Sequence, residues 1–494
     1  MLSRKKTALV AAIAATSFVP AAMAQTEWVG DVDQNYNNQL NWAGDMFPDG
    51  SIGQPGGNAN INVGTGGSFP ILSSDPAFTP NDIFIGLNTG NSGRLDHSAG
   101  LLSTGQGNWF FVGQNGGDGL YNMTGSASLN VGGSPQTGNF FVARNSGGDT
   151  AALPTSGVFN MNTTGELNTR GFFTGGNNAG TSAVTLDNGT INVLRFDNGD
   201  GTFTGGNFEV GSGFAGLSTG VNTFDMNGGT INAANELWLG QSGTTTTNIT
   251  AGTINSEAWL VGAGRDGGSL AVTNMSGGTI NAATRAGFFL TGAFSNSNGV
   301  FNMSGGQLNA DARGQDNGII TGENGTGTLN LSGTADVNSG FFQIGNNDGA
   351  IGLVTVTGSN VSVDALEISL GLRFDGSGLV DTTGQGTLGF VADANGVSAL
   401  NIAGDIRLDS PDGDFLTVDL SSYTGPYADI LLIDGSAVLG EFTGLSQGDV
   451  VATGGTDIYT IDYTGGDVYL RAVPEPASLG LIGLAGLVLM RRRR

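Results

Sequence analysis

The ten residues TNMSGGTINA (Thr273–Ala282) hold two short strand patterns separated by a glycine step. In the copy FNMSGGQLNA (Phe301–Ala310), Phe301 and Met303 would point to one side and Asn302 to the other, which is the period of a β-strand. The glycine step then turns the chain into a second short strand that carries an Ile or a Leu. Further copies are FDMNGGTINA (Phe224–Ala233), TNITAGTINS (Thr247–Ser256) and LNLSGTADVNS (Leu329–Ser339), with looser ones starting at Tyr121 and Val184.

A second motif, a bulky apolar stretch that ends near a glycine, alternates with the first. From Gly86 to Gly371 its ten intervals average (371 − 86)/10 = 28.5 residues, and single intervals run from 22 to 36 residues. Its copies are IFIG (from Ile83), WFFVG (Trp109), FFVA (Phe140), FFTG (Phe172), FEVG (Phe208), LWLG (Leu237), WLVG (Trp259), FFLTG (Phe288), IITG (Ile319), FQIG (Phe342) and EISLG (Glu367).

Several short strands in each repeat, with almost no helical periodicity, predict an all-β, right-handed parallel β-helix of about eleven rungs closed by β caps. One rung cannot bury its apolar face alone, whereas stacked rungs share one core. A β-propeller is the competing fold, but its blades are longer, about 40–50 residues each. The expected organisation is a signal peptide (1–24), an N-terminal cap (25–80), β-helix repeats (81–372), a C-terminal β module (373–472) and a C-terminal sorting segment (473–494).

Charge and composition exclude several classes of function. Seven of the 17 basic residues lie in the two terminal segments, which leaves 17 − 7 = 10 arginines and 42 − 1 = 41 acidic residues between them, a net charge of about −31. Such a surface repels nucleic-acid phosphates, so we expect no nucleic-acid partner. With no cysteine in the chain, disulfides, iron–sulfur clusters and thiolate zinc sites are excluded.

The N-terminal segment has the three parts of a secretory signal. A basic region (Arg4 to Lys6) precedes a short apolar run, and Ala22–Ala24 gives the small-x-small pattern of a cleavage site. We expect cleavage between Ala24 and Gln25. A resident transmembrane helix is the alternative, but the apolar run is short for a span.

The C-terminal stretch VPEPASLGLIGLAGLVLMRRRR (Val473–Arg494) resembles the PEP-CTERM sorting signal of Gram-negative bacteria. The parts occur in that family's order: Pro474-Glu475-Pro476, a short apolar transmembrane helix from Ala477 to Met490, and the cytoplasmic arginines Arg491, Arg492, Arg493 and Arg494. The resemblance implies processing by a membrane-embedded exosortase, a transient membrane anchor, and a location at the cell surface or in extracellular matrix. An ordinary C-terminal anchor that contains two prolines is the alternative.

The two segments that flank the repeats resemble another group of proteins. Glu27–Gly50 is non-repetitive and aromatic, and Leu416–Leu470 alternates strongly without the repeat. Both resemble parts of surface-exported β-strand repeat and autotransporter-passenger-like proteins, which implies terminal β modules.

An asparagine recurs within the second strand pattern of the repeats. These asparagines could be glycan acceptors, but a column of amides hydrogen-bonded between rungs is the better interpretation, and the sequons at Asn274 and Asn302 arise from the same repeat. The residues of the column are Asn232, Asn255, Asn281, Asn309 and Asn338.

Catalytic and metal-binding candidates are few. Glu236 and Glu257 could form a carboxylate pair of the kind that glycosidases use, with Trp238 and Trp259 as sugar platforms, although their register differs by one between rungs. We expect His97 to have a turn or surface role. The clusters Asp197–Gly201 and Asp409–Asp414 offer oxygens for weak Ca²⁺ binding, but neither has a recognised calcium-loop spacing, so no cofactor or defined metal site is predicted.

These observations predict a non-enzymatic, exported structural or adhesive rod, with exopolysaccharide as its candidate partner. Two alternatives remain open on the same fold: a polysaccharide lyase or glycosidase, and a carbohydrate-binding module without turnover.

Overall fold

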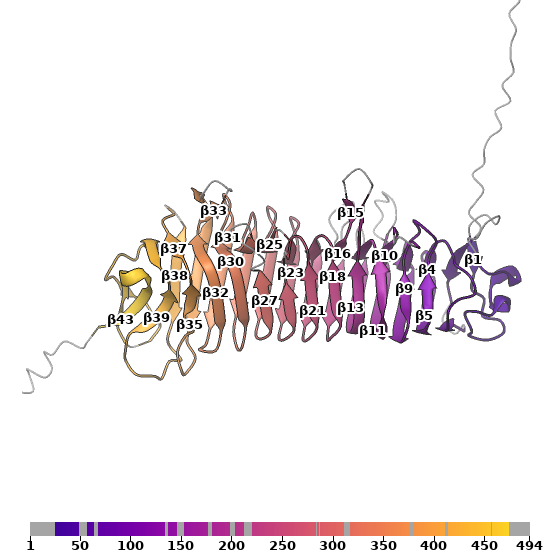
Figure 1. Cartoon of the computed structure of the whole chain (residues 1–494), viewed down its shortest axis with the longest axis horizontal. Coiled ribbons are helices and arrows are strands. Elements are labelled where there is room, and N and C mark those ends of the chain that lie inside the picture. The colour runs from indigo at the N-terminus through magenta and orange to yellow at the C-terminus, as the bar shows by residue number, and fades with distance from the viewer. Residues whose placement is uncertain are drawn as a thin grey trace, which may run out of the picture.

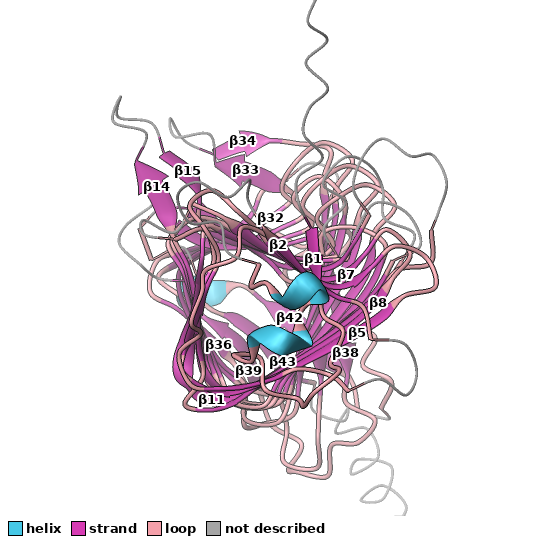
Figure 2. Ribbon diagram, turned by 90° about the vertical axis from the view of Figure 1, so that its right-hand side faces the viewer, coloured by secondary structure: helices cyan, strands magenta, loops and turns pink. Residues whose placement is uncertain are grey.

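The computed structural model describes residues 25–48, 57–63, 68–133, 137–145, 153–175, 180–197, 203–211, 220–282, 284–285, 287–310, 317–374, 379–410, 413–455 and 457–473. These residues form an elongated rod whose regular secondary structure is almost entirely β-strand, with the N-terminal strands at one end and the C-terminal strands at the other (Figure 1). Successive coils stack along the axis, so the end-on view looks down a tube with strands on its sides (Figure 2).

Three ladders of parallel strands run along the rod, and we call them faces 1, 2 and 3. From β4 onward the coils contribute a strand to each face, and the longer strands β11, β13, β30 and β32 pass round a corner and serve two faces.

Face 1 carries the first strand of each sequence repeat. Its strands are β3 (Ile71–Ser73), β5 (Ser92–Ala99), β8 (Asp118–Gly125), β11 (Ser156–Thr169), β13 (Thr181–Val193), β17 (Val221–Met226), β20 (Thr244–Ile249), β23 (Leu270–Met275), β26 (Asn298–Met303), β29 (Thr326–Leu331), β31 (Ile351–Thr357), β35 (Gln385–Val391) and β38 (Asp414–Asp419).

Face 2 follows the glycine step. Besides parts of β11 and β13, its strands are β6 (Leu101–Ser103), β9 (Ser128–Asn130), β18 (Thr230–Ala233), β21 (Thr253–Ser256), β24 (Thr279–Asn281), β27 (Gln307–Ala310), β30 (Asp336–Ile344), β32 (Ser362–Leu370), β36 (Leu400–Ile402) and β39 (Ile430–Asp434).

Face 3 carries the bulky apolar motif. Besides parts of β30 and β32, its strands are β1 (Gln25–Glu27), β2 (Asn58–Ile61), β4 (Ile83–Leu87), β7 (Phe110–Gln114), β10 (Asn139–Arg144), β12 (Gly171–Thr174), β16 (Asn207–Val210), β19 (Leu237–Trp238), β22 (Leu260–Ala263), β25 (Gly287–Thr291), β28 (Asn317–Thr321), β37 (Asp405–Leu408) and β40 (Ala437–Gly440).

The remaining elements are short. Two hairpins project from the coils, β14 (Arg195–Asp197) with β15 (Phe203–Gly205) and β33 (Leu372–Phe374) with β34 (Leu379–Asp381). The ends carry β41 (Val450–Val451), β42 (Tyr459–Asp462), β43 (Val468–Ala472) and the 3-10 helices η1 (Gln39–Asn41), η2 (Ala43–Asp45) and η3 (Thr464–Gly466).

The register places equivalent residues of successive repeats directly above one another. Met226, Ile249, Met275 and Met303 are consecutive partners on face 1, and all four side chains are buried. Columns of this kind join into one apolar core that extends from Trp28 to Leu470. The expected sharing of a core between rungs is therefore confirmed.

Face 3 is buried on both sides along strands that carry the bulky motif, such as β4 and β7, whereas β37 and β40 are partly exposed. Phe110, Phe140 and Phe172 stack inside the tube with ring centroids 5.2 Å apart. Outside it, Phe111 stacks on Phe141 at 5.2 Å and belongs to a separate apolar cluster. This double burial explains why the face 3 motif has consecutive bulky residues, whereas the strands of faces 1 and 2 alternate.

A left-handed backbone at the corner from face 3 to face 1 explains the glycine that ends the motif. Gly86 has a φ of +73°, and a Cβ there would lie 1.9 Å from the carbonyl oxygen of Asp118 on the next coil. Glycine therefore lets the chain turn and stack closely at this corner without strain. Ala143 takes the same corner in the FFVA copy with a φ of 59°.

The parallel ladders extend beyond residues 81–372 in both directions. Towards the N-terminus β1 pairs with β2, and β2 with β4, all within the segment expected to be a cap or at its border. Towards the C-terminus β35, β37, β38 and β40 continue the stacking. The coil therefore has more rungs than the eleven copies of the face 3 motif, because strands without that motif still pair in parallel.

Each end of the rod is closed differently. At the N-terminal end the aromatic side chains of Trp28, Tyr36, Trp42, Phe47 and Phe78 pack together, with Trp42 and Tyr36 fully buried. At the C-terminal end the pairing becomes antiparallel, because β43 pairs with both β39 and β42. Antiparallel pairing occupies the edge that another parallel coil would need.

Within the described residues, no helix is long and apolar enough to cross a membrane. The expected transmembrane segment from Ala477 to Met490 lies outside them, as does the signal peptide up to Ala24.

Candidate functional site

The asparagine column predicted from the sequence is present on face 2. Each Nδ2 donates a hydrogen bond to the Oδ1 of the asparagine on the preceding coil, at 2.8–3.2 Å. The column is longer than expected and comprises Asn130, Asn168, Asn192, Asn232, Asn255, Asn281, Asn309 and Asn338. We call it the face 2 ladder.

A second column runs along face 1 and was missed by the sequence reasoning. Asn274, Asn302 and Asn330 each donate to the preceding residue of the column, at 2.8–3.0 Å, and the column begins at Asp225 with the bond from Asn248. A separate segment joins Asp96, Asn122 and Asn160. The sequence feature that could have predicted this column is the Asn between two apolar residues in copies such as FNM. The same Asn, repeated, accounts for the sequons at Asn274 and Asn302.

The strand register places the two candidate carboxylates, Glu236 and Glu257, at non-equivalent positions of successive coils. Leu237 pairs with Leu260, which places Trp259, rather than Glu257, level with Glu236. Glu257 instead lies near Arg285, with an Nε–Oε2 distance of 3.7 Å. Burial raises the pKa of Glu236, and nearby Arg265 opposes the rise. The two carboxylates therefore face different partners.

The two tryptophans also differ in environment. Trp238 is buried, and the Arg265 guanidinium lies 3.6 Å from its ring centroid. Trp259 is 39% exposed and contacts Phe288 edge-on, with ring centroids 6.4 Å apart. Trp259 alone of this pair offers an open ring face of the kind that stacks on a sugar.

His97 is a core residue, so the expected turn or surface role is wrong. Its side chain is fully buried, with Nδ1 2.9 Å from the Tyr121 hydroxyl and Nε2 2.9 Å from the Gly100 carbonyl oxygen. Burial lowers its pKa to about 4, so the ring is neutral at physiological pH. Both ring nitrogens are engaged, which leaves neither for a metal or a substrate proton.

No group of three or more His, Cys, Asp or Glu side chains within the described part of the chain is arranged to hold a metal ion. Most of Asp197–Gly201 lies outside that part. Asp414, the last residue of the Asp409–Asp414 cluster, is fully buried.

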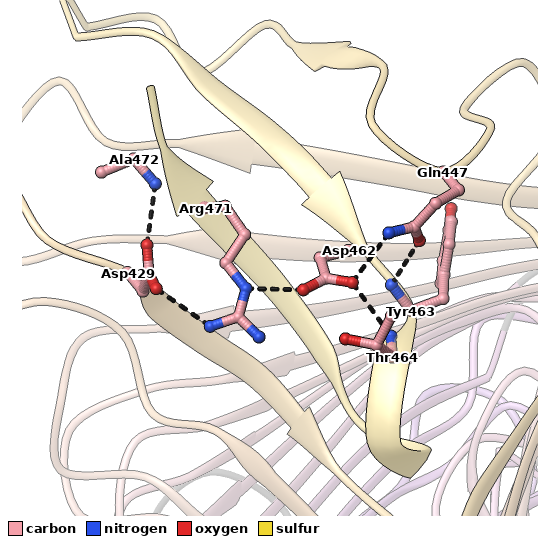
Figure 3. A network of polar contacts seen from close by, with 7 residues as sticks. All are labelled: Asp429, Gln447, Asp462, Tyr463, Thr464, Arg471 and Ala472. Atoms are coloured by element: carbon pink, nitrogen blue, oxygen red, sulfur yellow. Dashed lines mark hydrogen bonds and ion pairs between the residues drawn. The ribbon is translucent and has the colours of Figure 1, made fainter. Parts of the chain in front are cut away.

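A polar clamp holds the last described strand in the C-terminal cap (Figure 3). Arg471 on β43 donates to Asp462 on β42 at 2.6 Å and to Asp429 at 2.9 Å. Asp429 also accepts from the backbone N–H of Ala472 at 3.0 Å. The Tyr427 hydroxyl donates to the carbonyl oxygen of Val473 at 2.5 Å. The chain is therefore held up to the residue before Pro474.

Asp462 is the centre of this clamp. It accepts hydrogen bonds from Gln447 Nε2 at 2.8 Å and from the backbone N–H of Thr464 at 3.0 Å, in addition to the bond from Arg471. Burial alone would raise the pKa of Asp462, but these hydrogen bonds outweigh burial and hold the pKa well below its usual range. Nothing in the local sequence pattern identified this network, because its members come from separate strands and loops.

The sorting residues Pro474, Glu475 and Pro476, the segment to Met490 and the arginines Arg491, Arg492, Arg493 and Arg494 lie outside the described residues. Gln25, the expected first residue after cleavage, begins β1 and pairs with Asn58.

Comparison with known proteins gives one match, at the end of the chain that the clamp holds. No curated protein and no solved structure matches the chain. Residues 472–494 match the family model of the PEP-CTERM protein-sorting motif. That match begins at Ala472, the residue whose N–H is bound to Asp429. The chain therefore carries a PEP-CTERM sorting motif, which marks an exported, envelope-associated protein that exosortase-type machinery processes.

Proposed function

We propose that the protein is a non-catalytic structural or adhesive rod at the cell surface or in the extracellular matrix. The PEP-CTERM motif would anchor it transiently in the membrane before processing. The right-handed sense of the coil and the short transmembrane helix from Ala477 to Met490 are parts of this proposal.

The observation that carries the proposal is the unbroken repetition along the rod. One apolar core and the face 2 ladder tie coil to coil, so the molecule is stiff along its axis. In contrast, the best carboxylate pair for catalysis is out of register and its members face different partners. A rod of this kind presents repeated polar rows to its surroundings.

Exopolysaccharide is the partner that this surface suits best. Shallow grooves lie beside the face 2 ladder, one lined by residues that include Asn232, Asn255 and Glu257 and another lined by Asn338, Asp364 and Asn401. Each ladder amide after the first uses one N–H between coils. Asn168, Asn192, Asn309 and Asn338 also donate to a neighbouring side chain, whereas Asn232, Asn255 and Asn281 have the second N–H for other partners. Repeated amides of this kind can exchange hydrogen bonds with sugar hydroxyls.

The intact mass of the native protein, taken separately from cell envelope and culture medium, tests the sorting part. We expect a species that starts at Gln25 and ends near Pro476. A species that still ends at Arg494 and is confined to membranes would contradict processing.

Retention on the producing organism's own exopolysaccharide tests the adhesive part. We expect saturable retention of the purified protein without release of shortened glycan. Release of shortened product, lost in Glu236→Gln and kept in a matched Glu166→Gln variant, would favour the alternative of a polysaccharide-acting enzyme.

A further inference from the structure

The corner from face 3 to face 1 has an inward-pointing position that small residues usually fill. On consecutive coils towards the C-terminus it is Gly299, Gly327, Gly352 and Gly386. A Cβ on Gly386 would lie 2.5 Å from the carbonyl oxygen of Ile344 and 3.0 Å from the Cβ of Leu370. The interior is therefore closed to larger side chains at these coils.

After four coils with glycine, the last coil has an aspartate at this position. Asp414, the first residue of β38, is the register partner of Gly386. Its side chain is fully buried. The position is glycine on the four preceding coils, and on earlier coils Asn222 and Thr245 fill it with buried polar side chains. On the last coil it thus holds a carboxylate, at the end of the face 1 ladder.

Only one of the two carboxylate oxygens of Asp414 has a hydrogen-bond partner. Oδ2 accepts from the backbone N–H of Ser410 at 3.0 Å, whereas Oδ1 has no partner among the described residues. No ion pair in that part of the chain includes Asp414. A buried carboxylate oxygen without a hydrogen bond destabilises the folded state, and a bound cation or a proton would relieve this cost.

A second buried oxygen next to Asp414 also lacks a hydrogen-bond partner. Ser410 is 8% exposed, and its Oγ has no hydrogen-bond partner among the described residues. The Ser410 N–H bond to Asp414 places this hydroxyl in the same turn as the carboxylate. The two unpaired oxygens do not hydrogen-bond to each other, although a direct O–H···O⁻ bond would satisfy both.

The charge around the turn favours a cation. Burial raises the pKa of Asp414 to about 8, the hydrogen bond from Ser410 opposes this, and nearby Asp409 adds to the rise. Asp409 is exposed at the surface next to the turn. A cation would relieve both the burial of Asp414 and its repulsion with Asp409.

We propose that this turn binds Ca²⁺ through the Asp414 carboxylate, the Ser410 hydroxyl and the Asp409 carboxylate. Ca²⁺ takes six to eight oxygen ligands in flexible, irregular geometry, whereas Mg²⁺ demands a near-ideal octahedron. The site lies where the coil meets the C-terminal cap, because Thr443 of the cap bonds the Asp414 backbone in both directions, at 2.6 and 3.3 Å. Bound Ca²⁺ would join the last coil to that cap.

Equilibrium dialysis and calorimetric titration of the full chain with Ca²⁺ test this site. We expect one site that Asp414→Asn abolishes and Ser410→Ala weakens about tenfold, because each variant removes one oxygen ligand. Asp118→Asn is the matched control, since it removes the same charge from the exposed first residue of β8 and should leave the site intact. The same Ca²⁺ binding in Asp414→Asn as in the unchanged chain would overturn the proposal.

Thermal unfolding separates loss of the site from loss of the fold. Because Asn has the shape of Asp without its charge, Asp414→Asn should keep the β-sheet circular dichroism and melt no earlier than the unchanged chain in the absence of Ca²⁺. Ca²⁺ should raise the melting temperature of the unchanged chain and of Asp118→Asn, but not that of Asp414→Asn. No binding of Ca²⁺ to the unchanged chain would mean that a proton holds Asp414 neutral, and would also overturn the proposal.

Discussion

The side chain of Asn281 donates a hydrogen bond of 2.8 Å to Asn255, which lies directly below it on the preceding coil. Asn255 donates in turn to Asn232, also at 2.8 Å. All the amides of the face 2 ladder point the same way, so each bond polarises the next. A ladder amide between two others uses its Nδ2–H as donor and its Oδ1 as acceptor between coils. The ladder therefore adds side-chain hydrogen bonds to the backbone hydrogen bonds that already join each pair of strands.

Replacing Asn255 with Ala should destabilise the rod, because it removes both the bond that Asn255 donates to Asn232 and the bond that it accepts from Asn281. The expected loss is about 1–2 kcal/mol, seen as a lower midpoint in urea unfolding. Thr253→Ala, on the same strand and the same outward side, is the control and should change the midpoint much less. Equal midpoints for the two variants would mean that the ladder contributes nothing to stability.

Much of this architecture could be predicted because the repeat is local. The spacing of Asn232, Asn255 and Asn281 was enough to predict their stacking, since residues at equal positions of stacked coils must lie together. What the pattern could not give was the register across unequal coils. The separation of Glu236 from Glu257 depends on how β19 aligns with β22, which is set by packing inside the tube.

Two further features were beyond the reach of pattern reasoning. Beyond Gly371 the motifs fade, yet Leu388 still pairs with Val354, because parallel backbone pairing needs no particular side chains. A turn or surface role was expected for His97 because the chain has no second histidine to pair with it, but Tyr121 on the next coil supplies a partner that makes its burial possible.

The stability of the rod should depend on pH through Glu323. Burial raises its pKa from 4.5 to about 7, and its Oε2 has no hydrogen-bond partner among the described residues. Between these two values the folded state binds more protons than the unfolded state, so stability falls as the pH rises through this window. Above pH 7 the buried charge of Glu323 lowers the free energy of unfolding by its full amount, about 3 kcal/mol, as the shift of the pKa gives.

Glu323→Gln should remove this dependence, because the amide is neutral at every pH. We expect the variant to melt at a higher temperature than the unchanged chain at pH 8 and at a similar temperature at pH 5. Glu257→Gln removes an equal charge from a half-exposed site and should not reproduce the gain at pH 8. A melting temperature of the unchanged chain that stays constant between pH 5 and 8 would contradict the prediction.

The C-terminal clamp should respond to pH in the opposite sense. The pKa of Asp462 is depressed in the folded state, so its contribution is present above the ordinary carboxyl value and is lost as the pH falls towards its folded pKa. We therefore expect amide exchange in β42 and β43, compared after correction for intrinsic rates, to become faster below about pH 4. Asp462→Asn should show faster exchange at neutral pH and little further change on acidification. Protection of these strands that is the same in both proteins at neutral pH would show that the clamp does not hold the cap.

The sorting motif and the folded rod should be separable at Val473. The clamp residues Asp429, Asp462 and Arg471 all precede this point, and the backbone N–H of Val473 still bonds to Ile458 at 3.0 Å. Deletion of residues 474–494 should therefore leave the circular dichroism and the melting temperature unchanged, while the protein is no longer processed or retained in the envelope.

A milder variant checks the same point. Pro474→Ala with Pro476→Ala keeps the apolar segment and the arginines, and should keep the protein in the membrane fraction in its unprocessed form. Cell fractionation with intact mass measurement shows whether this double variant stays unprocessed and membrane-bound.

The deletion of residues 474–494 has two outcomes that would contradict the prediction. If the deletion variant unfolds, the tail is part of the fold. If it distributes between envelope and medium like the full chain, sorting depends on the rod instead.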